Sequence, residues 1–543
     1  MEITGVTYSV AHYEHYRRHG DLNYFEEIID KMILDQVVGM NESFRRTIEG
    51  MSRDKKRMAI LSLLEKDRTL FSKIKALIDK GINRMEHIKD VVLMLREYVK
   101  IADVEKKKYG EVMTPLDLIK EMINTLPSEV WSNPNLKWLD PANGTGPYPI
   151  MVIYKLMNGL KDWEPDDEKR YKHIVENMIY VAELQPKNMF LYMCAVDPFD
   201  KYKLNVYTGS FLEKEFDYHM KTVWNVNKFD IVIGNPPYNK SIEGSGTNAG
   251  SIYDEFVSKS IKYTDRLLFV IPLKWSNNSY REFRREVLSF GIDKLIILKE
   301  GDKVFSTTGV GEICFLSLFN SSKSFLISEI DTKFKELNSF SIQIEDNIKI
   351  LEEGFIFSDT HLSILKKIYN KSNTFLNNYY RNPQLIKTNL LSKTSKILIG
   401  DGVDFLVRKA KGENVVVNLQ ILDNSVLLNL KHDNYKVCFE KIYGGYSNNT
   451  FSNLDILNPN QITTEGISFF DFNSLSEAEN MKNYLNTKFS IFLRRIKQYD
   501  RSFTSMVFSY IPYLDFSNSW SDDRLMEYFN FSEKEIQIIK SSF

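Results

Sequence analysis

Seven short apolar runs, spaced between residues 136 and 320, most strongly limit the fold of this chain. Each run has the length of one strand, and most are followed by a loop and then by apolar residues at the spacing of a helix. Strands that alternate with helices predict a mostly parallel sheet with helices on both faces. We therefore expect an α/β fold with a doubly wound sheet of seven strands. The runs are LKWLD, MIYVAEL, KLNVYTGSFL, FDIVIGNPPY, RLLFVIPLKW, DKLIILKEG and EICFLSLFN.

The chain is too long for one hydrophobic core, since 543 residues suggest about two to four domains. Residues 1–106 have a helical apolar pattern, and the alternation of strands and helices occupies residues 107–322. Residues 323–500 are rich in Asn, Lys, Phe and Tyr, with strand-like fragments and no repeated βαβ pattern. We expect a mixed α+β domain there, followed by a C-terminal segment of residues 501–543.

The composition is that of an ordinary globular protein, with 43% hydrophobic residues, 26% charged residues and a net charge of -1. No stretch approaches the roughly 18 consecutive apolar residues of a membrane helix, and the N-terminus lacks the apolar core of a secretory signal. Cys194, Cys314 and Cys438 lie far apart, which predicts neither a disulfide framework nor a metal site. We therefore expect a cytoplasmic protein that binds no membrane and no metal.

Two motifs at strand ends predict a nucleoside site, because ligands of doubly wound sheets lie at the carboxyl ends of the strands. In DPANGTG, Gly144 and Gly146 allow a tight turn and a close approach of backbone to a ligand. Pro147 and Pro149 suit the first turn of the helix that follows. Glu183, after the second strand, stands where such sheets place the carboxylate that accepts hydrogen bonds from two ribose hydroxyls. For the glycine motif taken alone, the alternative is a plain turn. For Glu183 taken alone, the alternative is a solvated glutamate at a strand end.

The strongest chemical signal is Asn235-Pro236-Pro237-Tyr238, directly after the apolar strand FDIVIG. Consecutive prolines fix the backbone in an extended turn. An exocyclic aromatic amine is a poor nucleophile because its lone pair is delocalised into the ring. The Asn235 side-chain oxygen and the Pro236 carbonyl can accept both amine hydrogens and direct the lone pair at a methyl donor. Tyr238 offers an aromatic face on which an extruded base can stack.

The order of the motifs resembles the gamma group of DNA adenine-N6 methyltransferases of restriction-modification systems, strongly over residues 107–320. The resemblance implies a Rossmann-like methyltransferase sheet and S-adenosylmethionine as cofactor. Thr114 and Pro115, in YGEVMTP, also predict a helix start, with a capping hydroxyl followed by a proline. Many members of the family carry an aspartate at the position of Ser210, to accept from the cofactor's adenine amine, and serine accepts only weakly. The implied cofactor residues are Thr114, Pro115, Asp140, Ala142, Gly144, Gly146, Glu183, Ser210 and Phe211, and the implied catalytic residues are Asn235, Pro236, Pro237 and Tyr238.

The same resemblance implies that residues 323–500 recognise the target DNA and that residues 501–543 pack back on the core. Basic and aromatic residues interleave in this region, in NYYRNPQLIKTNLLSKTSK and VRKAKG, as phosphate and base-edge contacts require. A solvated surface is the alternative for each cluster alone. Double-stranded DNA is the expected partner, with a cognate restriction endonuclease as a further candidate. The basic residues expected to contact backbone phosphate are Arg494, Arg495, Lys497 and Arg501.

The function expected from these motifs is methylation of adenine N6 in DNA by base flipping and direct transfer. Four alternatives stay open: a bifunctional restriction-modification enzyme, an RNA methyltransferase, a protein-glutamine methyltransferase, and a non-catalytic DNA-binding subunit. Against a nuclease, Asp103, Glu105 and Lys107 lie in a charged helical hinge rather than on a small sheet. Against a glutamine methyltransferase, the long region after the core favours DNA. Against a non-catalytic subunit, Asn235 and the glycine turn are intact.

Overall fold

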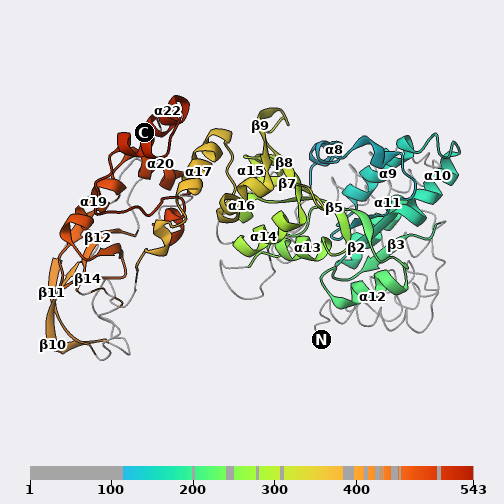
Figure 1. The fold of residues 1–543 in the computed structure, drawn as a ribbon. Helices are drawn as coiled ribbons and strands as arrows, with labels where there is room; N and C mark the ends of the chain where they lie inside the picture. Colours follow the sequence, from blue (N-terminus) through green and yellow to red (C-terminus); the bar gives the residue numbers. More distant parts are fainter. Residues whose placement is uncertain are drawn as a thin grey trace. The chain divides into compact units, whose positions relative to one another are not determined.

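The computed structural model describes residues 114–197, 202–239, 250–276, 280–305, 311–382, 397–408, 414–421, 429, 431, 433–441, 451, 454–497 and 503–541. The predicted helical region of residues 1–106 lies outside this part of the chain. The chain divides into two compact units, residues 1–346 and 347–543, and each is described by itself (Figure 1). No described helix is both long and apolar enough to cross a membrane.

The first unit is built on one sheet, which has nine strands within the described residues. Their order is β3-β2-β1-β4-β5-β7-β6-β8-β9. Five of the eight ladders are parallel, whereas β7 is antiparallel to β5 and β6, and β9 is antiparallel to β8. The predicted α/β fold with a large, mostly parallel central sheet is therefore confirmed. The strands are β1 Trp138–Asp140, β2 Ile179–Glu183, β3 Asn205–Thr208, β4 Phe229–Gly234, β5 Thr264–Pro272, β6 Ile292–Leu298, β7 Ile313–Phe319, β8 Ser324–Ile330 and β9 Glu336–Gln343.

The sheet extends beyond the seven strands that the sequence predicts. β8 pairs in parallel with β6, and β9 returns beside β8, so the predicted boundary after residue 322 falls inside the sheet. β9 lies at the sheet edge, and six of its eight side chains are exposed. Because the strand is exposed, its sequence ELNSFSIQ does not need to alternate apolar and polar residues along its whole length, and the pattern of a half-buried strand is missing.

Helices cover both faces of this sheet, as Figure 1 shows. α8, α9 and α11 bury their apolar sides in one core cluster with residues of β1, β2 and β4. α13 contacts β5 and α14 contacts β7 on the opposite face. The helices of this unit are α8 Leu116–Asn124, α9 Pro147–Gly159, α10 Asp167–His173, α11 Pro186–Val196, α12 Lys214–Thr222, α13 Tyr253–Ser260, α14 Arg281–Phe290 and α15 Gly301–Phe305.

The second unit combines two small sheets with helices, in the orders β11-β10-β14 and β13-β12-β15. Its final segment packs within this unit, since α22 contacts α17 and α20 and Lys367 pairs with the buried Glu535 at 2.7 Å. The strands are β10 Ile397–Arg408, β11 Asn414–Ile421, β12 Tyr435–Glu440, β13 Asp455–Leu457, β14 Gln461–Thr463 and β15 Ile467–Phe472. The helices are α16 Ile344–Glu353, which begins at the boundary, α17 Asp359–Lys371, α19 Leu475–Leu485, α20 Lys488–Lys497, α21 Asp522–Tyr528 and α22 Glu533–Ser541.

Two of the basic residues predicted to contact phosphate are buried instead. The Arg494 side chain is 2% exposed and stacks over the rings of Phe451 and Phe503. Lys497 is 4% exposed and donates a hydrogen bond to the Glu353 carbonyl. α20 is amphipathic, and its inward face carries these two long side chains because their stems pack well against aromatic rings. Arg495, on the opposite face, is exposed, and Arg501 lies outside the described residues.

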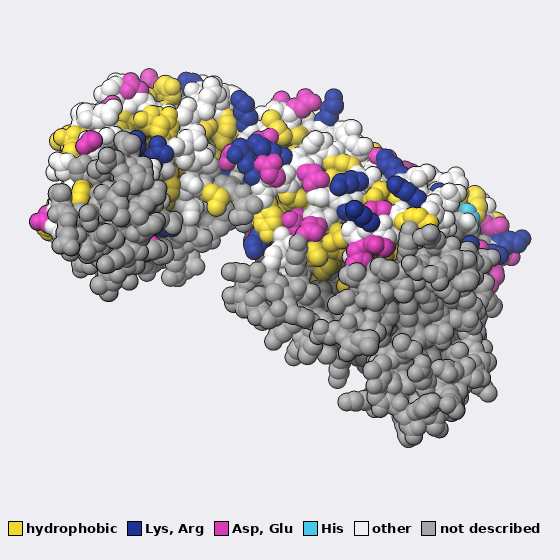
Figure 2. Space-filling model, turned by 90° about the horizontal axis from the view of Figure 1, so that it is seen from below, with side chains coloured by type: hydrophobic (Ala, Val, Ile, Leu, Met, Phe, Trp, Pro, Cys, Tyr) yellow, Lys and Arg dark blue, Asp and Glu magenta, His cyan; other side chains and the backbone are white. Residues whose placement is uncertain are grey.

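Basic side chains do not form one continuous field on the described face that Figure 2 presents. Figure 2 shows Lys and Arg interspersed with Asp and Glu on the face that it presents. Arg408, from the predicted cluster VRKAKG, is 9% exposed and bonds to Asp455 at 3.2 Å. Arg381 is more exposed and lies 3.6 Å from Asp471. Several other predicted basic residues, among them Lys387, Lys393, Lys396, Lys409 and Lys411, lie outside the described residues.

Candidate functional site

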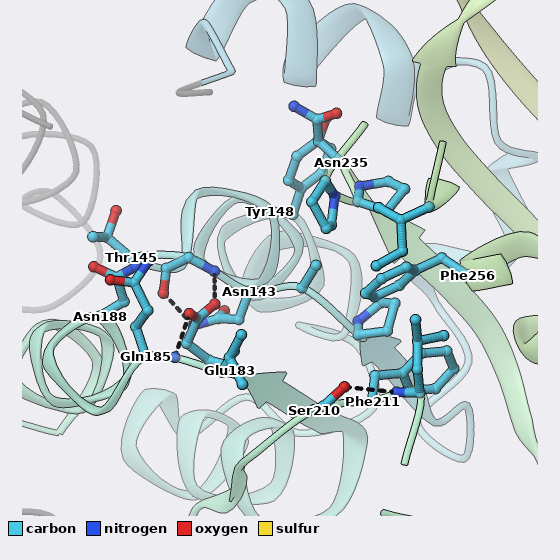
Figure 3. Close-up of a pocket in the computed structure, with 18 of the residues that line it drawn as sticks. Asn143, Thr145, Tyr148, Glu183, Gln185, Asn188, Ser210, Phe211, Asn235 and Phe256 are labelled. Atoms are coloured by element: carbon cyan, nitrogen blue, oxygen red, sulfur yellow. Dashed lines mark hydrogen bonds between the residues drawn. The ribbon is translucent and has the colours of Figure 1, made fainter. Parts of the chain in front are cut away.

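A cavity of about 180 Å³ opens at the carboxyl ends of β1, β2, β3 and β4. In Figure 3, Asn235 and Tyr148 lie at its top, Ser210 and Phe211 at its bottom, and Glu183 at its left. Most of the residues singled out in the sequence line this one cavity: Thr114, Ala142, Gly144, Glu183, Ser210, Phe211, Asn235, Pro236, Pro237 and Tyr238. Pro115, Asp140 and Gly146 are not among the lining residues.

The turn after β1 has the tight backbone geometry that its glycines predict. Gly144 has φ +55° and Gly146 has φ +92°, both in the left-handed region. A Cβ at Gly146 would lie 2.3 Å from the buried Tyr192 ring, whereas a Cβ at Gly144 would meet no atom of the described residues within 4 Å. α9 then begins at Pro147, with a proline in its first turn as predicted. Gly146 thus serves the packing of the turn, and Gly144 faces the cavity.

Glu183 connects the ends of β1 and β2 on the cavity wall. Its Oε2 accepts a hydrogen bond from the Gly144 N–H at 2.7 Å, and its Oε1 accepts one from the Gln185 N–H at 2.8 Å (Figure 3). A carboxylate oxygen can accept more than one hydrogen bond, so these contacts are compatible with further bonds to a ligand. The carboxylate is held on both sides by the backbone.

Asn143 lines the cavity although the sequence analysis did not single it out. Its side chain is 2% exposed and donates from Nδ2 to the Gly144 carbonyl at 2.9 Å. Its Oδ1 is buried and accepts no hydrogen bond from a described residue. A buried acceptor without a donor costs free energy, so it calls for an explanation such as a bound ligand. The only sequence signal for this residue is its place inside the DPANGTG turn.

Asp140 is buried behind the turn. Its Oδ1 accepts a hydrogen bond from the Ala142 N–H at 3.0 Å. The pKa of Asp140 is raised to about 8, chiefly because the carboxyl is buried; the Ala142 hydrogen bond lowers this pKa and the nearby Glu183 charge raises it. A Cβ at Gly234 would lie 2.7 Å from Asp140 Oδ1, so the glycine before Asn235 leaves room for this carboxyl. The sequence analysis missed this role of Gly234.

The lower end of the cavity is aromatic. Phe211 stacks on Phe256 at 5.5 Å between ring centroids, and both rings line the cavity. Ser210 accepts a hydrogen bond from the Leu212 N–H at 3.2 Å. Phe256 lies on α13, beyond the motifs, and no local pattern marks it as a lining residue. A flat ring can lie against the aromatic pair, with the Ser210 hydroxyl at its edge.

Asn235, at the end of β4, is bonded to the segment before α8. Its Nδ2 donates to Thr114 Oγ1 at 2.9 Å, and its Oδ1 is buried with no partner among the described residues. The predicted capping role of Thr114 is wrong, because α8 begins at Leu116 with Pro115 at the cap position and no side-chain cap. The Thr114 hydroxyl accepts from Asn235 rather than from the first turn of the helix.

Part of the chain that forms this cavity matches the model of a known protein family. Residues 154–305 match the family model described as Eco57I restriction-modification methylase. This segment is therefore similar to the Eco57I restriction-modification methylases. The match includes Glu183, Ser210 and the Asn235 turn, and it begins inside α9.

One curated relative is similar in sequence to part of this chain. An uncharacterized adenine-specific methylase of Mycoplasma pneumoniae is 25% identical over an alignment of 333 residues, and the match covers 48% of this chain and 78% of the relative. Among solved structures, a modification subunit of a type I restriction enzyme from Vibrio vulnificus YJ016 has a TM-score of 0.35 at 12% identity. That alignment covers 55% of this chain and 62% of the subunit. The DrdV–DNA complex has a TM-score of 0.45 at 12% identity and covers 95% of this chain and 72% of that one.

Tyr238 lines the same cavity next to the proline turn. The residue is 9% exposed. Burial raises the pKa of Tyr238 well above its ordinary value, with smaller effects from Tyr148 and Cys314. The hydroxyl therefore stays protonated at neutral pH, and the side chain can contribute a ring face and a hydroxyl but not an acid–base group. Among the described residues, no group of three His, Cys, Asp or Glu side chains is placed to hold a metal ion.

Proposed function

We propose that this chain transfers a methyl group from S-adenosylmethionine to the N6 amine of an adenine in double-stranded DNA. The observation that carries the proposal is the buried, unsatisfied Oδ1 of Asn235 in the cavity that also holds the glycine turn and Glu183. An acceptor at this place suits an amine hydrogen. The family match and the adenine-specific relative support the same reaction.

The cavity residues fit S-adenosylmethionine along its length. Glu183 would accept from the ribose hydroxyls, and the rings of Phe211 and Phe256 would contact the adenine. Asn143 Oδ1 would accept from the α-ammonium group, which supplies the donor that this buried oxygen lacks. Ser210 would meet the edge of the adenine. When bound, the cofactor supplies an electrophilic methyl group on a sulfonium.

Asn235 and Pro236 would raise the nucleophilicity of the target amine. The Asn235 Oδ1 and the Pro236 carbonyl each accept one amine hydrogen, which favours a tetrahedral nitrogen with its lone pair free to attack. The two prolines hold both acceptors still, so little reorganisation is needed at the moment of transfer. The amine loses a proton after it is alkylated, because only then is it acidic. No charged base and no covalent intermediate are required.

An adenine inside a duplex cannot reach this cavity, so the base must leave the helix. Tyr238 offers the ring on which the flipped base would stack. The second unit would bind and select the DNA, with the exposed Arg495 and the half-exposed Arg381 as candidate phosphate contacts. A restriction endonuclease with the same specificity is the proposed partner in the cell.

The test is incubation of the purified chain with unmethylated genomic DNA and methyl-labelled S-adenosylmethionine, followed by nucleoside analysis and mapping of the modified positions. We expect labelled N6-methyladenine at one short sequence. Asn235→Ala should lower the rate by at least about 10²–10³-fold while cofactor affinity changes little. Asn158→Ala, on the exposed side of α9, is the matched control and should keep full activity.

If an added RNA or protein fraction is labelled and DNA is not, DNA is the wrong substrate, whereas methyl transfer from S-adenosylmethionine is still supported. Unchanged DNA methylation by the Asn235→Ala variant would refute the role of Asn235. Cofactor binding without transfer to any of the three would favour a non-catalytic subunit.

A further inference from the structure

The hydrogen bond between Asn235 and Thr114 has a direction that matters for the proposed reaction. Asn235 Nδ2 donates to Thr114 Oγ1 at 2.9 Å across 121 residues of sequence. The bond joins the segment before α8 to the turn after β4. Thr114 is 2% exposed, so water competes little for its hydroxyl.

A carboxamide has one accepting side and one donating side, and a half-turn about its terminal bond exchanges them. With Nδ2 held by Thr114, Oδ1 is the atom left for another partner, and it has none among the described residues. The opposite orientation would present two N–H donors to the two N–H donors of an amine. Such a pairing offers no hydrogen bond and would hold the amine away.

We infer that Thr114 is a positioning residue, which fixes the Asn235 carboxamide so that Oδ1 accepts from the substrate amine. The inference rests on the proposed function and differs from the role that the family resemblance implies, which is contact with the methionine end of the cofactor. The two roles make opposite kinetic predictions. A positioning residue affects the rate at saturating cofactor, whereas a cofactor contact affects cofactor affinity.

The test compares Thr114→Val, which keeps the shape and loses the hydroxyl, with Thr114→Ser, which keeps the hydroxyl. Thr222→Val, on the exposed side of α12, is the control. We expect Thr114→Val to lower kcat by about 10–100-fold, the usual cost of losing an orienting contact, with the Kd for S-adenosylmethionine within about threefold. Thr114→Ser should restore most of the rate. A tenfold weaker Kd with unchanged kcat for Thr114→Val would overturn the inference.

A second measurement separates this inference from the proposed function. Thermal unfolding of Thr114→Val, Asn235→Ala and the double variant reports whether the two side chains are coupled, with or without activity. We expect the shift of Tm in the double variant to be smaller than the sum of the two single shifts. Additive shifts would overturn the inference. Coupled shifts in a chain that transfers no methyl group to DNA would overturn the proposed function and leave only the positioning of the Asn235 carboxamide by Thr114.

Discussion

Glu183 and Gly144 are joined by a 2.7 Å hydrogen bond from the glycine N–H to the carboxylate Oε2. The bond ties the end of β2 to the turn after β1, the two places where the sequence carries its cofactor motifs. Because Gln185 holds the other oxygen, the carboxylate has one orientation before any ligand arrives. The turn and its carboxylate therefore act as one preformed element.

Glu183→Gln should weaken this element. A side-chain amide has one accepting oxygen, so the variant can keep the bond to Gly144 or the bond to Gln185 but not both. We expect the Kd for S-adenosylmethionine to rise by about tenfold or more, and Tm to fall. Isothermal titration and thermal unfolding measure the two effects. Glu129→Gln, at an exposed residue that is not among those lining the cavity, is the control, and equal affinities in both variants would contradict the role of Glu183.

Asn143→Ala should weaken binding of ligands that carry an amino-acid portion. The variant loses the buried Oδ1 that would accept from the α-ammonium. We expect affinity for S-adenosylhomocysteine to fall about tenfold, by the loss of one hydrogen bond to a charged group. Affinity for 5′-methylthioadenosine, which lacks the ammonium, should not change. A parallel loss for both ligands would show that the substitution only disturbs the turn.

The two glycines of the turn should differ in their tolerance of alanine. Gly146→Ala combines a positive φ with a Cβ 2.3 Å from Tyr192, whose ring is buried. Overpacking of this kind costs about 1–3 kcal/mol in addition to the backbone strain. Gly144→Ala has the strain of about 1–2 kcal/mol alone, since no atom in the described part of the chain lies within 4 Å of its Cβ. Denaturant unfolding should rank Gly146→Ala as clearly less stable, and the reverse order would contradict the geometry of the turn.

The stability of the unliganded chain should depend on pH through Asp140. Its pKa is raised from 3.8 to about 8 by burial, so the folded chain holds a proton that the unfolded chain releases. The stabilising effect is complete below about pH 4 and is lost as pH rises through 8. Between pH 5 and 8, Tm should therefore fall more steeply for the unaltered chain than for Asp140→Asn, which stays neutral. Parallel Tm profiles would show that Asp140 does not titrate in this range.

Ser210→Asp should strengthen cofactor binding. The serine already accepts from the Leu212 N–H at 3.2 Å, and an aspartate can keep this bond with one oxygen while the other faces the adenine amine. We expect the Kd for S-adenosylmethionine to fall about three- to tenfold. Ser132→Asp, on an exposed turn, controls for the added charge. Weaker binding by Ser210→Asp would indicate that the adenine does not lie at this end of the cavity.

The sequence predicts the part of the sheet in which strands alternate with helices. β1 to β7 are each visible as a short apolar run, and the glycine, carboxylate and proline motifs follow the ends of these strands and line one cavity. β9 is not predicted because it is an exposed edge strand whose side chains gain little from burial. The edge position exists only after β8 has paired with β6, which is a long-range event.

The contacts inside the cavity are less predictable than its motifs. Thr114 looks like a helix cap because hydroxyls favour that place, yet a partner from 121 residues away takes the hydroxyl instead. Arg494 looks like a phosphate ligand because it is basic, yet Phe451 and Phe503 surround it. In each case a tertiary contact overrides a local preference, because Asn235 and Phe451 lie far along the sequence from the residues that they contact.

The described cavity residues all lie between Thr114 and Phe256, and the sheet that holds them ends at Gln343, before the second unit begins. During synthesis, at about 5–20 residues per second, the first unit leaves the ribosome roughly 10–40 seconds before the second is finished. Its strands can pair without waiting for the later residues. The nascent chain can therefore complete its cavity while the second unit is still being translated.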